Sequence, residues 1–188
     1  MDENDTYWND GLGWESLGSE TAPFATAFNG DGHVIRNLYI NRPFTKNIGL
    51  FGYVSGEKSS LSNIGLTGPL MQVIGDDYVG SLVGYLNTKA SITKTFNTGT
   101  VTGEYYVGGV IGYLSSASLT QSFSTGTVTG RHNVGGLVGR AEDSILSNNF
   151  ITGFTTGNSA SGSIAGYSFS TTITNTYWAT DTTKQKLN

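Results

Sequence analysis

The octapeptide FNTGTVTG, residues Phe96–Gly103, returns almost unchanged as FSTGTVTG, residues Phe123–Gly130. The two copies begin 27 positions apart and differ at one residue. A fixed internal period of about 20–50 residues is typical of repeat proteins, in which each repeat is one structural unit that stacks on the next. The octapeptide therefore predicts a stack of similar units and gives the length of one of them.

Four columns of residues extend this period along the chain. One column is aliphatic: Leu38, Ile64, Ile92, Leu119, Leu146 and Ile173. A second column is aromatic: Phe96, Phe123, Phe150 and Tyr177. Two columns are glycine: Gly52, Gly84, Gly112, Gly139 and Gly166, and then Gly75, Gly103, Gly130 and Gly157. We expect the first glycine column and the aromatic column to be structural. A side chain at these glycines would collide with a stacked neighbour, or the backbone there has an angle that only glycine adopts.

One unit, read from Gly103, is GEYYVGGVIGYLSSASLTQSFSTGTVT. Its runs VGGVIGYL, SLTQSF and TGTVT are too short for ordinary helices, and their β-branched residues favour strands. A lone unit would be unstable, because about five buried apolar side chains contribute roughly 1.5–3 kcal/mol each. Ordering the backbone costs about 1–2 kcal/mol per residue. Stacking extends the core, so we predict an all-β fold, a parallel β-helix (β-solenoid) with about 27 residues per coil and about six coils.

Composition excludes several classes of function. The net charge is −4 and no basic stripe is present, so we expect no nucleic-acid partner. The chain has no cysteine, hence no disulfide and no thiolate metal site. We expect no membrane insertion, because no stretch is long and apolar enough to span a bilayer. The only histidines are His33 and His132, and no catalytic motif surrounds either one, so we predict that the chain is not an enzyme.

The runs IGLFGYV, VGSLVGYL, VGGVIGYL, VGGLVGRA and SGSIAGYS resemble the GLUG motif, which is named for its G-L-(any)-G core. FATAFNGDGHVIRNLYINRPFTKNIGLFGYV resembles the segment that commonly precedes GLUG arrays, and NTYWATDTTKQ the segment that often closes one. The resemblance covers about residues 20–185, and it departs at Arg140 and Ala165. It implies a right-handed parallel β-helix outside the cell, of the kind found in large bacterial and archaeal surface proteins, including adhesin-like ones.

Three regions follow from these patterns. Residues 1–18 form an acidic N-terminal segment, and we expect Trp8 or Trp14 to cover the first coil, because an open solenoid end is an unpaired strand edge. Residues 19–180 form a single solenoid domain of GLUG-type repeats, and residues 181–188 form a polar tail. We expect the chain to be a piece of a larger parent protein.

A column of aromatic residues is the first candidate binding surface. Its members are Tyr53, Tyr85, Tyr113, Arg140 and Tyr167. Exposed tyrosine rings could form a platform for sugar rings, with the hydroxyls as hydrogen-bond donors. Aromatic stacking that stabilises the solenoid without any ligand explains the same column. Strand parity does not decide between these interpretations, because both sides of the strands are apolar.

A turn provides the second candidate, a site for Ca²⁺. Asp76, Asp77 and Glu104 lie in neighbouring turn columns, and their carboxylates are the oxygen ligands that Ca²⁺ prefers. Stacked carboxylates repel one another unless a cation or Arg131 compensates them. A variable, exposed turn without a metal is the other interpretation. We expect no other cofactor.

Threonines provide the third candidate. Thr98, Thr100 and Thr102 recur as Thr125, Thr127 and Thr129. If Val101 and Val128 point inward, the flanking threonines point outward. Such rows are similar to the flat faces of ice-binding solenoids, although Phe154 interrupts them, and threonine is in any case a good strand former on a solvated face.

These features predict a non-catalytic structural or adhesive module of a secreted or cell-surface protein. It would act as a stiff stalk or as a surface-binding segment, with a host-surface or matrix glycan or protein as its partner. The alternatives are a carbohydrate-binding module that uses the tyrosine column or the acidic turn, and an ice-binding face built on the threonines.

Overall fold

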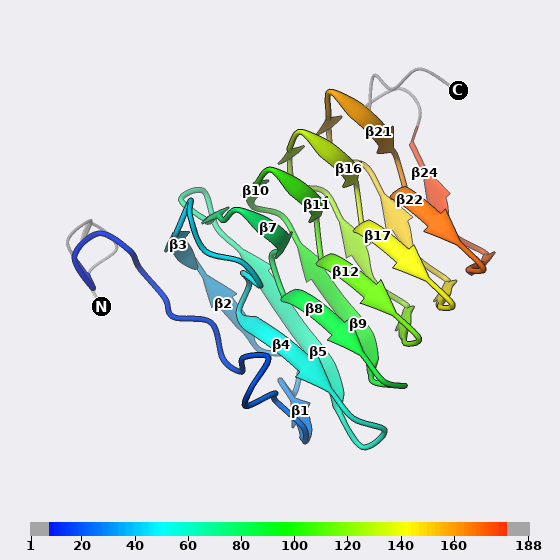
Figure 1. Ribbon diagram of the computed structural model, residues 1–188, viewed down its shortest axis with the longest axis horizontal. Coiled ribbons are helices and arrows are strands. Elements are labelled where there is room, and N and C mark those ends of the chain that lie inside the picture. The colour runs from blue at the N-terminus through cyan, green and yellow to red at the C-terminus, as the bar shows by residue number, and fades with distance from the viewer. Residues whose placement is uncertain (1–7, 180–188) are drawn as a thin grey trace.

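The computed structural model describes residues 8–179. These residues form 24 β-strands and no α-helix. Every strand pairing is parallel, and the strands stack side by side from the N-terminal to the C-terminal end (Figure 1). The predicted fold class, a parallel β-solenoid with coils of about 27 residues, is confirmed. Residues 1–7 of the predicted N-terminal segment and the whole of the predicted polar tail, residues 181–188, lie outside the described residues.

The strands form four sheets. The long sheet contains β1 (Ala27–Asn29), β2 (Val34–Arg36), β5 (Ser60–Thr67), β9 (Ser91–Asn97), β13 (Ser118–Thr120), β14 (Phe123–Ser124), β18 (Ile145–Ser147), β19 (Phe150–Ile151), β23 (Thr172–Thr174) and β24 (Tyr177–Trp178). The threonine sheet contains β3 (Tyr39–Asn41), β6 (Gln72–Ile74), β10 (Thr100–Thr102), β15 (Val128–Thr129) and β20 (Thr155–Thr156). The edge sheet contains β7 (Asp77–Gly80), β11 (Tyr105–Gly108), β16 (His132–Gly135) and β21 (Ser159–Gly162). The tyrosine sheet contains β4 (Phe51–Ser55), β8 (Val83–Asn87), β12 (Ile111–Ser115), β17 (Val138–Glu142) and β22 (Ala165–Phe169).

The tyrosine and threonine sheets each have five strands, so the described residues make about five turns, and β23 and β24 add a sixth level to the long sheet alone. The aliphatic column differs from the prediction at its N-terminal end. In the observed register Ile92 pairs with Leu61, which pairs in turn with Phe28. Leu38 and Ile64 therefore do not belong to this column, and the first turn lacks an edge-sheet strand.

Alternation along the strands builds the core. Val73, Val101 and Val128 lie above one another on the threonine sheet and are fully buried. One cluster of buried apolar side chains continues through the stack from Leu38 to Ile151. Burial of this kind stabilises a coil only when a neighbouring coil covers its apolar side chains. The stack is therefore stable, although a single coil would not be.

Each turn of the chain bends at left-handed residues that are not glycine. The first bend column is Tyr78, Tyr106, Asn133 and Ala160, the second is Thr88, Ser116, Asp143 and Ser170, and the third is Asn63, Lys94, Gln121, Asn148 and Asn175. Asparagine tolerates a positive φ, whereas larger side chains adopt it at a cost of roughly 1–2 kcal/mol. The repeated bends redirect the chain from one sheet to the next.

The glycine column of the tyrosine sheet is explained by close approach of backbone. A Cβ added to Gly139 would lie 2.3 Å from the carbonyl carbon of Tyr106 and 2.4 Å from the nitrogen of Val107. Gly112 meets Tyr78 and Val79 in the same way. Neither glycine has a positive φ. The neighbouring backbone, and not a special backbone angle, therefore requires glycine here.

The aromatic column lies outside the core. Phe123 is 38% exposed and Phe150 is 47% exposed, and the rings of Phe96 and Phe123 stack with their centroids 4.9 Å apart. The inward positions beside them are polar. The Ser122 backbone N–H donates to Asn149 Oδ1 at 3.0 Å, which joins one coil to the next. Because hydrogen-bonded polar side chains occupy the inside of this bend, the phenylalanines point outward.

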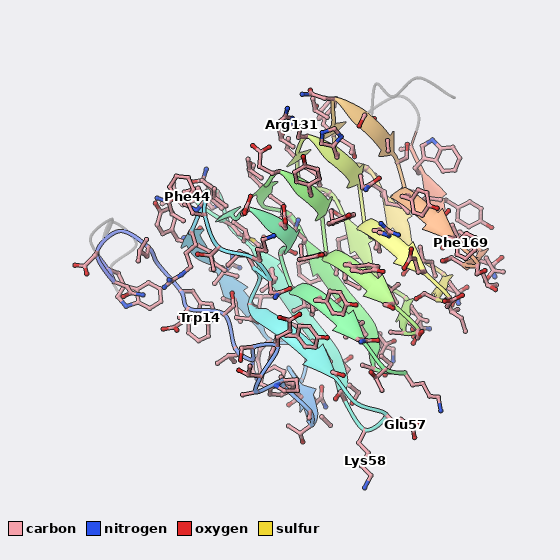
Figure 2. All side chains as sticks on the ribbon, in the orientation of Figure 1. Trp14, Phe44, Glu57, Lys58, Arg131 and Phe169 are labelled. Atoms are coloured by element: carbon pink, nitrogen blue, oxygen red, sulfur yellow. The ribbon has the colours of Figure 1, made fainter. Side chains whose placement is uncertain are left out.

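The segment from Trp8 to Phe24 crosses the N-terminal end of the stack. Trp14 packs against the core, and its indole N–H donates to the carbonyl of Leu50 at 3.0 Å. Leu17 forms a parallel bridge with Phe51. Figure 2 shows Trp14 at this end of the molecule. The segment therefore covers the outer edge of β4, which would otherwise be an unpaired strand.

Candidate functional site

The predicted tyrosine column exists as a continuous row on the tyrosine sheet. The register aligns Tyr53, Tyr85, Tyr113, Arg140 and Tyr167. Every position predicted for ligand binding therefore lies in one row, on successive strands of a single sheet. The leucines that follow the second and third tyrosines are fully buried, whereas the tyrosine rings are partly exposed.

A second row of tyrosines packs against the first. Tyr78 and Tyr106 stack on each other with their centroids 5.0 Å apart. Tyr78 contacts the Tyr85 ring edge-on at 5.7 Å, and Tyr106 lies 5.9 Å from the Tyr113 ring. Tyr78 and Tyr106 are not among the site residues predicted from the sequence. Their contact with the first row depends on the left-handed bend that directs both side chains toward the tyrosine sheet.

Arg140 takes the place of a tyrosine without breaking the row. Its guanidinium carbon lies 5.5 Å from the ring centroids of both Tyr106 and Tyr113, and 5.0 Å from that of Tyr167. Arginine is planar and stacks on aromatic faces, so it continues the packing of the rings. Arg140 Nε also donates to Glu142 Oε1 at 2.9 Å. The departure from tyrosine thus adds a charge without losing the stack.

Glu142 is the acceptor that holds this group together. The Tyr113 hydroxyl donates to its second carboxylate oxygen. That hydrogen bond, followed by the bond from Arg140, lowers the pKa of the Glu142 carboxyl below its ordinary value of 4.5. Burial, followed by the contact with Glu142, raises the pKa of the Tyr113 hydroxyl. At neutral pH the carboxylate is therefore ionised and the phenol remains a donor. We call this group the tyrosine surface; it consists of Tyr53, Tyr78, Tyr85, Tyr106, Tyr113, Arg140, Glu142 and Tyr167.

The stacking limits what the tyrosine surface offers to a ligand. Tyr53 and Tyr85 stack with an interplanar angle of 9° and centroids 4.7 Å apart, so each covers one face of the other. Tyr167, at the C-terminal end of the row, is 42% exposed. A ligand would therefore meet ring edges and hydroxyl groups at Tyr53 and Tyr85, whereas the Tyr113 ring lies perpendicular to that of Tyr85. The two interpretations of the column are compatible, because rings that stack on one another still present polar groups to solvent.

The acidic turn is neutralised by side chains of the chain itself. Lys46 Nζ lies 2.7 Å from Asp77 Oδ2, and Arg131 Nη1 lies 3.7 Å from Glu104 Oε2. Residues 8–179 contain no group of three or more His, Cys, Asp or Glu side chains arranged to hold a metal ion. The Ca²⁺ site remains an untested prediction.

The threonine rows point outward, as alternation around buried Val101 and Val128 requires. The rows are short. Thr100 pairs with Gln72 on one side, and Phe154 stands in the same row after Thr127. The row of Thr100 and Thr127 therefore spans two strands, β10 and β15, whereas the row of Thr102, Thr129 and Thr156 continues to β20.

One turn of this stack, from just before β11 to the end of β15, has a recognised sequence pattern. Residues 103–129 carry the GLUG motif. Over 96 residues, or 51% of the chain, the sequence is 38% identical to "Halomucin" from Haloquadratum walsbyi. Over 75 residues, or 39% of the chain, it is 40% identical to a "Putative Gly-rich membrane protein" from Evansella cellulosilytica. The matches span 1% and 9% of those proteins. No solved structure matches the chain significantly.

Proposed function

We propose that the chain is a non-catalytic, stiff spacer within a larger cell-surface protein. The observation that carries the proposal is the unbroken core, which runs through the stacked coils together with four sets of parallel ladders. Each coil is hydrogen-bonded to its neighbour on every side, so bending the stack would break several ladders at once. The length of such a spacer follows from its number of coils, at about 4.8 Å for each.

The comparisons support a surface location for the parent protein. One relative is named a membrane protein and the other a halomucin, and both are far longer than the matched region. None of residues 8–179 forms a helix long and apolar enough to cross a membrane. We place the spacer outside the cell, between other parts of its parent chain.

Pulling the molecule by its ends in optical tweezers tests the spacer proposal. A stiff stack should keep its native length as force rises and then unfold in cooperative steps. Gly139→Val should lower the unfolding force, because it separates neighbouring coils. Gradual lengthening at low force, without discrete steps, would contradict a mechanical role.

A second function, glycan binding, is favoured by the tyrosine surface. Tyr78 and Tyr106 hold left-handed conformations at a cost of roughly 1–2 kcal/mol each, where the next coils have Asn133 and Ala160. Because Asn133 and Ala160 make the same bend, the backbone does not require the two aromatic rings there. The hydroxyl row and the Arg140–Glu142 pair supply the donors and acceptors that a polysaccharide would need.

A glycan array tests this second function, run once with Ca²⁺ and once with EDTA. Binding should fall in Tyr85→Ala and Tyr113→Ala, whereas Tyr177→Ala on the long sheet serves as the matched control. Sensitivity to EDTA would implicate the acidic turn. Absence of binding in both buffers, or equal loss in the control, would leave the spacer as the only proposed function.

A further inference from the structure

Charged side chains avoid one face of the solenoid. Five stretches, one in each turn after the first, carry a single charged residue, Lys94, among them: residues 60–75, 90–103, 117–130, 144–157 and 171–179. These stretches contain all threonine-sheet strands after β3 and all long-sheet strands after β2. We call the outward side of these strands the uncharged face.

The ion pairs found among residues 8–179 all lie elsewhere. They are Lys46–Asp77, Lys89–Glu57, Arg131–Glu104 and Arg140–Glu142. Figure 2 shows charged residues at opposite edges of the view, with Arg131 at one edge and the neighbouring residues Glu57 and Lys58 at the other. Apart from Lys94, the charged side chains of residues 8–179 therefore lie outside these stretches.

Large apolar side chains are exposed on the uncharged face. Phe123, Phe150 and Tyr177 form its aromatic column and are 38%, 47% and 62% exposed. Phe154 and Ile145 flank this column and are 44% and 49% exposed. Aromatic side chains combined with a lack of charge are typical of the central part of a protein–protein interface.

We propose that the uncharged face is the interface between two copies of this chain, associated side by side. Two like faces can meet without repulsion, because neither presents more than one charge. The outward columns repeat at the strand spacing of about 4.8 Å, so the rows of one copy match the rows of another in an isologous contact. The partner is thus a surface with the same period, and a second copy supplies it.

The exposed area fits a reversible dimer. Aromatic side chains have about 150–250 Å² each, so the exposed fractions of these residues give roughly 400–500 Å² of apolar surface. A standard interface takes about 800 Å² from each partner. The surrounding threonine, serine and asparagine rows supply the remainder.

Other occupants fit this face less well. Phe96 and Phe123 stack with an interplanar angle of 3°, so they offer edges rather than the ring faces on which sugars stack. Phe154 interrupts the threonine rows that a flat ice-binding face would need. A protein surface with matching rows can pack against the ring edges and also against the Phe154 side chain.

Sedimentation velocity of the purified chain, from about 1 to 200 µM, tests the proposal. We expect a monomer–dimer equilibrium that added salt does not weaken, because Lys94 is the one charge on each face and like charges gain from screening. Phe150→Lys should raise the dissociation constant at least tenfold, since it would bury a charge in each copy. Tyr167→Lys is the matched control, with similar exposure in the last coil but on the tyrosine sheet, and it should leave the constant unchanged.

Disulfide trapping gives a second readout that does not depend on a charged variant. The chain has no cysteine, so Thr125→Cys places a single thiol on the uncharged face. Mild oxidation should give a covalent dimer, whereas Ser115→Cys on the tyrosine sheet should not. A monomer at every concentration, an equilibrium that Phe150→Lys leaves intact, or equal trapping of both cysteine variants would each overturn the proposal.

Discussion

A methyl group on Gly139 should be among the most damaging small changes to this protein. The added Cβ would lie 2.3 Å from the carbonyl carbon of Tyr106, 2.4 Å from the nitrogen of Val107 and 2.6 Å from the oxygen of Gly112. All three atoms belong to the backbone of the preceding coil, which cannot rotate away as a side chain would. Ordinary contact requires about 1 Å more space, in a stack whose neighbouring strands are about 4.8 Å apart.

The magnitude follows from overpacking and from strained ladders. Overpacking a well-packed interior costs about 1–3 kcal/mol, and each backbone hydrogen bond that lengthens costs up to roughly 0.5–1.5 kcal/mol more. We expect Gly139→Ala to lose about 3 kcal/mol and Gly139→Val to lose more. For a chain of this size, 3 kcal/mol lowers the melting temperature by about 6–12 °C. Gly112→Val should behave in the same way.

Thermal and urea unfolding, followed by circular dichroism, measure this loss. Gly32→Ala is the control, because nothing lies within 4 Å of its added Cβ and only its φ of +77° is unfavourable. That strain costs about 1–2 kcal/mol, so the control should lose clearly less than Gly139→Ala. Equal losses, or an unchanged melting temperature in Gly139→Val, would refute the account of the glycine column.

Four further substitutions test other parts of the structure. Phe123→Ala should lower the free energy of unfolding in urea by about 2 kcal/mol, because the ring is partly exposed. Leu119 is fully buried, so Leu119→Ala should lower it by about 2–5 kcal/mol. Equal losses in the two variants would place the Phe123 ring in the core. Ser124→Ala should raise the melting temperature by a few degrees, because the buried Ser124 hydroxyl has no hydrogen-bond partner among the described residues. Removing an unsatisfied polar group gains about 1 kcal/mol of stability. A lower melting temperature would mean that the hydroxyl does form a hydrogen bond. Glu142→Gln should lose about 1–2 kcal/mol at pH 7. Because the folded protein holds the carboxyl pKa below 4.5, the wild-type advantage should shrink as the pH falls from 4.5 through that lowered pKa. A stability difference that does not change on acidification would contradict this. Tyr106→Asn should change stability by less than about 1 kcal/mol, since the relief of backbone strain offsets the lost stacking, and a large loss would mean that the ring contacts dominate.

The sequence predicted the features that every coil must share. Gly112 and Gly139 were identified because the requirement for glycine recurs in each turn. The row through Tyr85 and Tyr113 was identified because similar residues stack on one another in successive coils. Both depend only on the period. The period is regular from Ile92 onward and irregular before it, which is why Leu38 and Ile64 were assigned to a column that Phe28 and Leu61 occupy.

Features that depend on the path within one coil could not be predicted. Tyr78 contacts Tyr85 from a different sheet, and only a left-handed bend brings the two rings together. Phe123 resembles a core residue in sequence, but polar side chains such as Ser122 occupy the inside of its bend. Lys46, the partner of Asp77, lies in an earlier turn with no repeat signal. In each case a non-local contact decided the arrangement.

The central claim is that the chain is a stack whose length is set by its number of coils. Double electron–electron resonance between spin labels at Ser62→Cys and Thr174→Cys tests it most directly, because the chain has no other cysteine. These positions lie in one outward column, four coil steps apart, so we predict a distance of about 19 Å. Inserting three further copies of residues 104–130 after Gly130 should lengthen it to about 34 Å with a narrow distribution. An unchanged distance, or a broad distribution in the extended chain, would contradict the account.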